Sequence, residues 1–297
     1  MKYTGNIYRP PFEARSLLLQ VTVGCSHNRC AFCTMYRDVP FSVESMEQIE
    51  RDLTEASTYA PHITRVFLEN GDPFVLSADK LQQIAERIHE KLPNVQTIAM
   101  YATVNNIKTK TDEELRMLRQ LGINELNIGV ESGLDAALTA MQKGYTADEA
   151  IAQLMRLKEA QIDYGANVIF GAAGPELRIE NAKKTAELIN QTEPYLIFTG
   201  TLHADPGCPL YEDMKSGTFI ENTVAEYLEE EEIFLRELTV ENCFYFGLHP
   251  SNIVPMSGML GADKEEMLRA IEKRKKHLSA RQLASIPRRR SEGAIIL

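Results

Sequence analysis

Apolar, strand-like runs alternate with amphipathic, helix-like stretches about six times between residues 17 and 202. The pattern predicts strands at 17–23, 65–68, 97–102, 126–130, 164–170 and 195–202. It predicts helices between them at 45–59, 77–92, 111–121, 146–160 and 179–192. Such alternation is typical of a parallel sheet with right-handed crossovers. Continuous apolar strands further indicate a sheet that is buried on both faces.

These elements predict an α/β fold, a partial (β/α)6 TIM-like barrel over residues 1–204, in preference to an open doubly wound sheet. Residues 205–297 form a C-terminal α/β extension that closes the barrel mouth without being an independent domain. It holds two further helices, near 223–238 and 262–279. Within the first of them, the acidic run Glu229–Glu232 is interpreted as a solvated helix face.

The net charge of −10, from 32 basic and 42 acidic residues, does not favour nucleic acid through bulk electrostatics. The tail differs, because ten Lys and Arg stand against five Asp and Glu from Asp263 onward, with Arg288–Arg290 among them. We interpret the tail as a solvated terminus or as a contact with a phosphate-bearing substrate or partner. No apolar run approaches the roughly 20 residues that span a bilayer, so we expect a cytoplasmic protein that uses no membrane.

Cys25, Cys30 and Cys33 lie on one loop directly after the first predicted strand. The carboxyl edge of a parallel sheet is where α/β proteins build their sites. An odd total of five cysteines, three of them clustered, argues against a disulfide framework and for metal or cluster ligation. A structural zinc site almost always takes four ligands, whereas three thiolates suit an iron–sulfur cubane with one open iron. A zinc site and inert thiols remain alternatives, and His27, Cys208 and Cys243 are the candidate extra ligands.

Five segments, each following a predicted strand, together resemble the radical S-adenosylmethionine (SAM) superfamily. The resemblance is to the branch that contains coproporphyrinogen dehydrogenases, methylthiotransferases and the Elongator catalytic subunit. The segments are the cysteine loop, Glu69–Pro73, Asn127–Gly133 with Met141–Gly144, Ile169–Gly174, and Asp205–Tyr211. One departure is the spacing: four residues separate Cys25 from Cys30, where the family usually has three.

The resemblance implies that the three cysteines hold a [4Fe–4S] cluster whose fourth iron is chelated by SAM. An electron from a donor such as flavodoxin or ferredoxin would then cleave SAM, and the resulting 5′-deoxyadenosyl radical would abstract hydrogen from the substrate. The protein would therefore be an oxidoreductase or a transferase. The cofactor carries this chemistry and the protein positions it, so no separate catalytic residue is assigned.

The resemblance also implies contacts with SAM. Backbone near Phe32 would touch the adenine, the turn Asn70–Gly71–Asp72 would hold the amino group through Asp72, backbone carbonyls or both, and Glu131 would bind the ribose. Asn167 and Ile169 would lie near ribose and adenine. Candidate substrate contacts are Tyr36, Tyr101 and His249, the last within the segment 244–252 that is otherwise interpreted as a closing strand.

We expect a small-molecule substrate. Two other hypotheses stay open: an RNA-modifying radical SAM enzyme that uses the basic tail, and a zinc-binding protein without catalytic activity.

Overall fold

A computed structural model of the chain describes residues 1–289 and 295–296, and side chains as far as residue 287. The chain divides into two compact units. Unit 1 comprises Met1–Asn28, Met35–Ile128 and Ala152–Tyr164. Unit 2 comprises Arg29–Thr34, Gly129–Ile151 and Gly165–Leu297.

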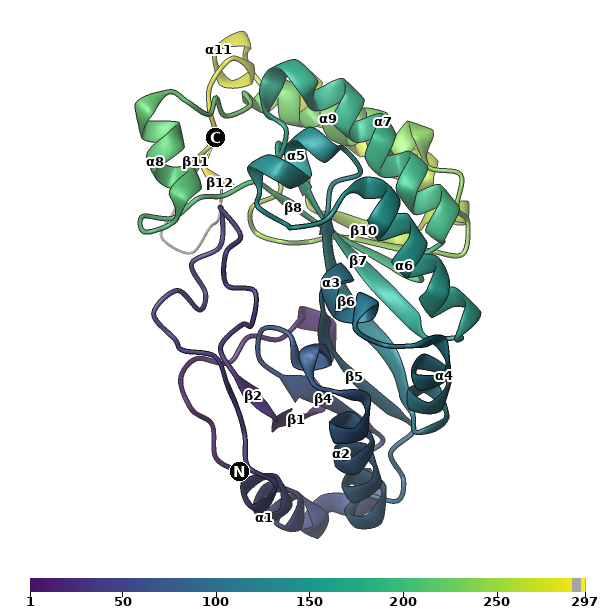
Figure 1. Cartoon of the computed structure of the whole chain (residues 1–297). Helices are drawn as coiled ribbons and strands as arrows, with labels where there is room; N and C mark the ends of the chain where they lie inside the picture. The colour runs from purple at the N-terminus through teal and green to yellow at the C-terminus, as the bar shows by residue number, and fades with distance from the viewer. Residues whose placement is uncertain (290–294, 297) are drawn as a thin grey trace. The chain divides into compact units, whose positions relative to one another are not determined.

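Unit 1 is a parallel sheet with helices packed on it (Figure 1). Its strands, in spatial order, are β1 (Leu17–Gln20), β4 (Arg65–Glu69), β5 (Thr97–Ala102) and β6 (Ile123–Glu131, whose last three residues belong to unit 2). A separate antiparallel pair is formed by β2 (Thr22–Val23) and β3 (Ser42–Val43). The helices are α1 (Met46–Ala56), α2 (Ala78–Lys91), α3 (Val104–Lys108) and α4 (Asp112–Gln120), with short 3-10 turns at Pro11–Glu13, Ser57–His62 and Pro73–Val75.

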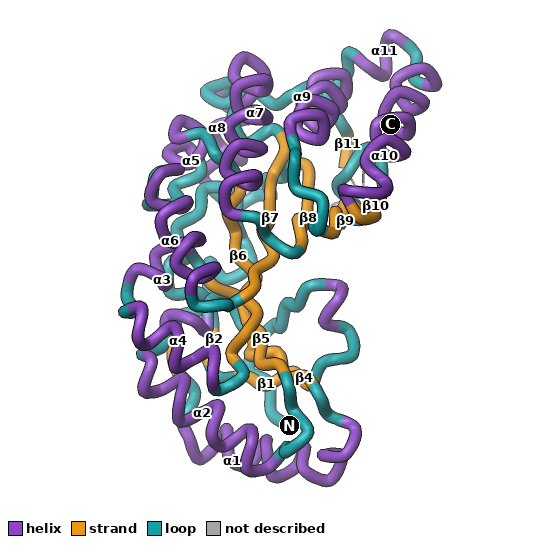
Figure 2. The backbone as a smooth tube through the Cα atoms, turned by 90° about the vertical axis from the view of Figure 1, so that its right-hand side faces the viewer, coloured by secondary structure: helices purple, strands orange, loops and turns teal. Residues whose placement is uncertain are grey.

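Local sequence explains where these helices begin and which face they bury. Ser45, Ser77 and Thr111 cap α1, α2 and α4 by accepting a hydrogen bond from a first-turn amide. Helix α2 buries Leu81, Ile84, Ala85 and Ile88, the spacing of a single helical face. Figure 2 shows α1, α2 and α4 lying along one side of the unit 1 strands.

Unit 2 is built on parallel strands and ends in an antiparallel edge. Its strands, in order, are β7 (Asp163–Phe170, whose first two residues belong to unit 1), β8 (Leu196–Thr201), β9 (Phe244–Gly247) and β10 (Met256–Met259), the last antiparallel to β9. The helices are α5 (Asp135–Ala140), α6 (Ala147–Glu159, which runs into unit 1), α7 (Gly174–Thr192), α8 (Pro209–Ser216), α9 (Val224–Glu237), α10 (Leu260–His277) and α11 (Ala280–Leu283). The backbone of β11 (Arg288–Arg289) pairs with β12 (Ile295–Ile296). Helix α7 packs against α9, and α9 against α10 (Figure 2).

The alternation of parallel strands and helices confirms the predicted α/β class. Several boundaries differ from the predicted ones. The first strand ends at Gln20, because Thr22–Val23 pairs instead with β3, and α7 begins five residues before the predicted Ile179. The division at residue 204 stays a prediction. The basic cluster falls largely outside the described part of the chain: Arg290 is not described, nor are the side chains of Arg288 and Arg289.

The solvated interpretation of Glu229–Glu232 is wrong for its two central residues. Glu230 is 0% exposed and Glu231 is 3% exposed. Helix α9 is covered by α7 on one side and α10 on the other, so acidic residues fall on buried faces as well as on the exposed one. Within the described residues, no helix is both long and apolar enough to span a membrane.

Candidate functional site

The first part of the cysteine loop belongs to unit 1 and is shaped by Asn28. Asn28 adopts a positive φ of 40°, donates its backbone N–H to Cys25 Sγ at 3.5 Å, and donates Nδ2 to the Tyr36 carbonyl at 2.7 Å. Asparagine tolerates this left-handed conformation better than most residues. Asn28 therefore gives the enlarged Cys25–Cys30 spacing a structural role, since it turns the loop and ties its two sides together.

The second part of the loop, residues 29–34, belongs to unit 2 and is pinned by two backbone hydrogen bonds. Ala31 donates its N–H to the Met141 carbonyl at 3.0 Å and accepts one from Leu210 N–H at 3.0 Å. Ala31 is buried in an apolar cluster with Met141, Leu210 and Cys208, against which Phe32 packs. Cys208 is thus a small core residue at the start of α8, and burial raises the pKa of the equally buried Cys243 thiol to about 12. By contrast, the thiols of Cys25, Cys30 and Cys33 are all half-buried, and none of them is in a disulfide.

The turn after β4 approaches the cysteine loop closely. Gly71 donates its N–H to the Gly24 carbonyl at 3.0 Å, and a Cβ added at Gly71 would lie 2.6 Å from Cys25 Cβ. Only glycine fits there. Asp72 Oδ1 accepts the backbone N–H of Ser26 at 2.9 Å, and its other oxygen accepts the Ser26 hydroxyl. The Asp72 carboxylate therefore anchors the cysteine loop.

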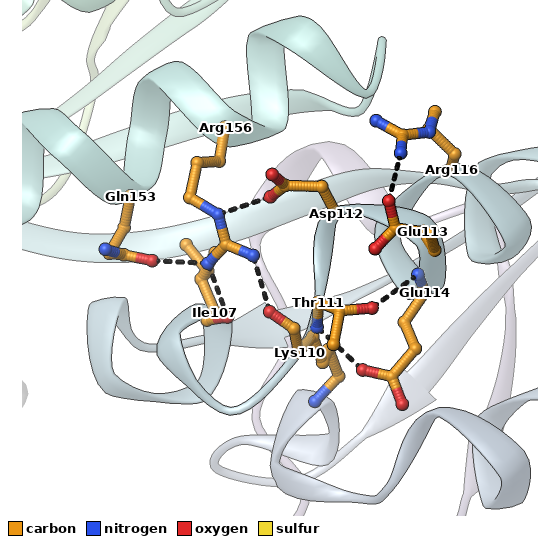
Figure 3. A network of polar contacts seen from close by, with 9 residues as sticks. All are labelled: Ile107, Lys110, Thr111, Asp112, Glu113, Glu114, Arg116, Gln153 and Arg156. Carbon is orange, nitrogen blue, oxygen red and sulfur yellow. Dashed lines mark hydrogen bonds and ion pairs between the residues drawn. The ribbon is translucent and has the colours of Figure 1, made fainter.

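Residues of helices α3 and α6 stabilise this turn through hydrogen bonds. The side chain of Asn106 hydrogen bonds to Asp72, and Lys110 Nζ donates to the Phe74 carbonyl at 2.7 Å. Figure 3 shows how Arg156 on α6 fixes the segment that carries Lys110: its guanidinium donates to the carbonyls of Ile107 and Lys110 and to Asp112. The Glu69–Pro73 turn is thus held in place by several layers of polar contacts.

Several buried polar atoms of unit 1, near the carboxyl ends of β4 and β5, have no hydrogen-bond partner in the described chain. They are Glu69 Oε1, Asn70 Oδ1, Tyr36 Oη, and both Oδ1 and Nδ2 of Asn127. Glu69 is 0% exposed, and burial raises its pKa to about 7. Leaving such groups buried and unpaired costs roughly 1–3 kcal/mol each, so their presence at one sheet edge indicates a polar ligand.

Tyr101 and Tyr36, the candidate substrate contacts in unit 1, belong to the same neighbourhood. Tyr101 lies on β5 opposite Asn127 of β6 and packs edge-on against Phe67, with ring centroids 5.3 Å apart. Tyr36 packs edge-on against Tyr8 at 5.5 Å. Burial, together with nearby groups that include Glu69, raises the pKa of both phenols, so both stay neutral.

Glu131, at the end of β6, forms a buried ion pair with Lys143. Oε1 and Nζ are 2.9 Å apart, and the two side chains are only 8% and 7% exposed. Burial alone would lower the pKa of Lys143, but the charges of Glu131, Tyr145 and Cys30 raise it well above its usual value. Glu131 has a positive φ of 64°, and a Cβ at Gly129 would lie 2.4 Å from its Oε1. Lys143 also lies 5.9 Å from the centre of the Phe32 ring.

Asn167 and Ile169 are half-buried and lie on the same face of β7. Asn167 pairs in register with Phe198 of β8, which in turn pairs with Phe246 of β9. The two phenylalanine rings stack at 5.4 Å, and His249 meets Phe198 edge-on at 5.8 Å. Asn167 on β7 and His249, in the loop after β9, thus each neighbour Phe198 of β8.

Three buried carboxyl groups predict how stability depends on pH. Burial raises the pKa of Glu69 and Glu231 to about 7 and that of Glu230 to about 8. A raised carboxyl pKa means that the folded state holds its proton more tightly, so the stabilisation is complete near pH 4.5 and is lost as pH rises through 7 to 8. Burial lowers the pKa of Lys110 to about 8. Lys110 therefore makes the folded state more stable as the pH rises, but only above about pH 8.

We therefore expect the free energy of unfolding, measured with urea, to fall by at least about 1.4 kcal/mol between pH 5.5 and pH 8, the equivalent of one pKa unit. Glu231→Gln should flatten the profile, because it removes one of the three groups. A profile that is level or rises with pH would contradict the burial argument.

Comparison with known proteins gives the family. The profile of the Radical SAM superfamily matches residues 19–189, more than half of the chain. The chain belongs to the radical SAM superfamily. The family's two cofactors, a [4Fe–4S] cluster and SAM, are therefore those of this chain, as the sequence predicted.

A curated relative in the suggested branch is the heme chaperone HemW of Bacillus subtilis strain 168, which is 24% identical over 178 residues. That match covers 59% of this chain and 46% of HemW, so the chain matches less than half the length of this relative.

Solved structures confirm the predicted partial-barrel fold. The radical SAM methyltransferase TsrM of Kitasatospora setae superposes with a TM-score of 0.55 at 16% identity, over 68% of this chain and 39% of that one. Elp3 of Methanocaldococcus infernus gives 0.53 at 15% identity, over 88% and 64%.

Glu69 and Asn127 in unit 1 and Lys143 in unit 2 are candidate functional residues that the sequence did not single out. Each of them lies within or beside a recognised motif. For two of them the sequence held a signal, a polar residue in or after an apolar strand: Glu69 follows the strand 65–68, and Asn127 interrupts the apolar run of β6. Among the described residues, no three His, Cys, Asp or Glu side chains form a site for a single metal ion. Cubane ligands need not do so, because each cysteine binds a different iron.

Proposed function

We propose that Cys25, Cys30 and Cys33 hold the [4Fe–4S] cluster and that the chain cleaves SAM reductively to act on a small-molecule substrate. When bound, the reduced cluster supplies the electron that converts SAM into a 5′-deoxyadenosyl radical able to abstract hydrogen. The chain's own residues bind, orient and shield the cofactor.

The observation that carries this proposal is the turn at Glu69–Gly71. Two acceptor oxygens there, Glu69 Oε1 and Asn70 Oδ1, are buried without a partner, and Gly71 lies against Cys25. An ammonium group offers three N–H donors and a positive charge, which suits these acceptors. A ligand whose amino group is held by this turn would lie beside Cys25, as SAM bound to the open iron requires. Glu69 is therefore a stronger candidate for the amino contact than Asp72, whose oxygens already accept hydrogen bonds from Ser26.

Unit 2 supports the other cofactor contacts. The Glu131 side chain is paired with Lys143, and its carboxyl oxygens can also accept hydrogen bonds from ribose hydroxyls. Lys143 also carries positive charge close to Cys30. Positive charge near a thiolate favours its ionised form, which is the form that binds iron.

His249 supports the substrate assignment in unit 2. Ser251 donates its backbone N–H to His249 Nδ1 at 3.2 Å, and the Ser251 hydroxyl lies 2.7 Å from the same nitrogen while accepting Thr201 N–H. Nδ1 is thus an acceptor, which places the imidazole hydrogen on Nε2. With Phe198 and Phe246 beside it, a donor at Nε2 suits a substrate that has both an apolar and a hydrogen-bond-accepting part.

The test is anaerobic reconstitution of the full chain with iron and sulfide, followed by dithionite and SAM. We expect about four irons per chain and formation of 5′-deoxyadenosine. A fully loaded cluster that fails to cleave SAM would reject the proposal.

Two other outcomes would favour the remaining hypotheses. Colourless protein with stoichiometric zinc would favour a zinc protein. RNA affinity that falls steeply with salt and disappears on removal of residues 281–297 would favour an RNA-modifying enzyme.

A further inference from the structure

Glu230 is a buried carboxylate for which the proposed mechanism has no use, and it reaches the turn that follows β7. We propose that Glu230 is a positioning residue that fixes this turn and, through Asn181, the end of β6 in the conformation that binds SAM. The proposal rests on the proposed function, because it assigns these two strand ends to the nucleoside part of SAM.

Three N–H donors converge on the Glu230 carboxylate. Oε2 accepts the backbone N–H of Gly171 at 2.9 Å and Nδ2 of Asn222 at 3.0 Å, and Oε1 accepts Nδ2 of Asn181 at 2.7 Å. These donors come from the end of β7, the loop before α9 and the middle of α7. The two oxygens of a carboxyl group can accept all three bonds, whereas a glutamine amide has a single acceptor oxygen and N–H groups of its own.

The network continues from Asn181 to the end of β6. Asn181 Oδ1 accepts the hydroxyl of Ser132, and Ser132 Oγ accepts the backbone N–H of Leu134 at 2.9 Å. Each bond in this chain donates toward Glu230, so the carboxylate is its terminal acceptor. Ser132 directly follows Glu131, the predicted ribose ligand, and Gly171 follows Ile169 by two residues. One carboxylate therefore sets the backbone at both predicted contacts.

Both turns are packed too tightly to move alone. A Cβ at Gly171 would lie 2.3 Å from Tyr227 Cε1, and Tyr227 lies one helical turn before Glu230 on α9. A Cβ at Gly133 would lie 2.3 Å from the Lys184 carbonyl of α7. A change in how α7 and α9 hold Glu230 would consequently shift the turns themselves.

Glu231 provides a matched control, because it is the next residue on α9, is equally buried and also has a raised pKa. Its carboxylate reaches a different place: Oε1 accepts the hydroxyl of Tyr245 on β9 at 2.7 Å. A single donor can still be satisfied by the carbonyl of glutamine. Glu231→Gln therefore replaces a buried carboxyl group on the same helix without touching either turn.

The experiment compares Glu230→Gln, Glu231→Gln and wild type, all reconstituted anaerobically as full chains. For Glu230→Gln we expect the dissociation constant for SAM, measured by equilibrium dialysis, and the KM for SAM to rise about tenfold, with kcat within about twofold and iron content unchanged. For Glu231→Gln we expect wild-type affinity. Equal SAM affinity in Glu230→Gln and wild type, or an equal loss in Glu231→Gln, would overturn the proposal.

Hydrogen–deuterium exchange and a second variant test the role of Glu230 separately from SAM cleavage. Hydrogen–deuterium exchange of the cluster-free chain should speed up at residues 168–175 in Glu230→Gln but not in Glu231→Gln, which tests the turn without any cofactor. If Glu230→Gln does not fold, Ser132→Ala breaks the far end of the same chain and should weaken SAM binding in the same direction. If exchange speeds up in Glu230→Gln as expected but reconstituted wild type does not cleave SAM, the proposed function is rejected. If wild type cleaves SAM but exchange in Glu230→Gln equals that of wild type, the role of Glu230 is rejected.

Discussion

Cys33→Ser is expected to leave the chain folded but to abolish both cluster loading and SAM cleavage. Serine is nearly isosteric, and the local turn depends on the backbone hydrogen bond from Cys33 N–H to the Cys30 carbonyl, which the substitution keeps. A serine hydroxyl is a harder and far less acidic ligand than a thiolate, so it binds the iron of such clusters much more weakly. Formation of 5′-deoxyadenosine should fall by more than about 100-fold, the upper end of what loss of even an outer-shell partner costs a metal site.

Cys208→Ala is the matched control for this prediction. Cys208 lies in the apolar cluster with Ala31 and Leu210, only 1% exposed, so its replacement should cost a little stability and leave iron content and cleavage unchanged. Iron is measured per folded chain after anaerobic reconstitution, and product by chromatography. Four irons retained in Cys33→Ser, or iron lost in Cys208→Ala, would show that the ligand set is wrong.

The sequence was most informative where a single local pattern decides the outcome. Six apolar runs became six parallel strands, and the helices predicted to start at Ser77 and Thr111 are indeed capped by these two residues. The clustering of three cysteines after the first strand also needed no tertiary information. Each of these features depends on residues close together in the chain, which is why propensity and spacing were sufficient.

Buried polar residues were not predictable in the same way. Glu230 and Glu231 stand in a run of four glutamates that has the composition of a solvated face, and only the packing of α7 and α10 on α9 makes two of them core residues. Asn70 and Asp72 were predicted as one contact group, yet Asp72 instead anchors Ser26, while Glu69 holds an unpartnered oxygen. Which of several neighbouring polar side chains faces a site depends on backbone direction within a turn, and residue type does not encode that.

The Glu131–Lys143 ion pair leads to the other large expected effect. Lys143→Met should lower the free energy of unfolding by about 3–5 kcal/mol, because it leaves the buried Glu131 carboxylate without its counterion. Glu131→Gln should lower the free energy of unfolding by a similar amount, because it leaves the buried Lys143 ammonium group without its counterion. The double variant removes both charges, so we expect it to be less destabilised than the sum of the two single changes, with a coupling energy of about 2–3 kcal/mol.

Urea unfolding of the four proteins, without SAM, measures this coupling independently of any ribose contact. Lys184→Met is the control: Lys184 pairs with Glu187 at 2.8 Å, but both side chains are about half exposed, so its loss should leave stability nearly unchanged. If the losses of unfolding free energy in the two single variants simply add up in the double variant, the two charges do not stabilise each other. The ion pair would then not be what holds these two buried side chains together at the end of β6, and the assignment of Glu131 as a ribose contact would lose this support.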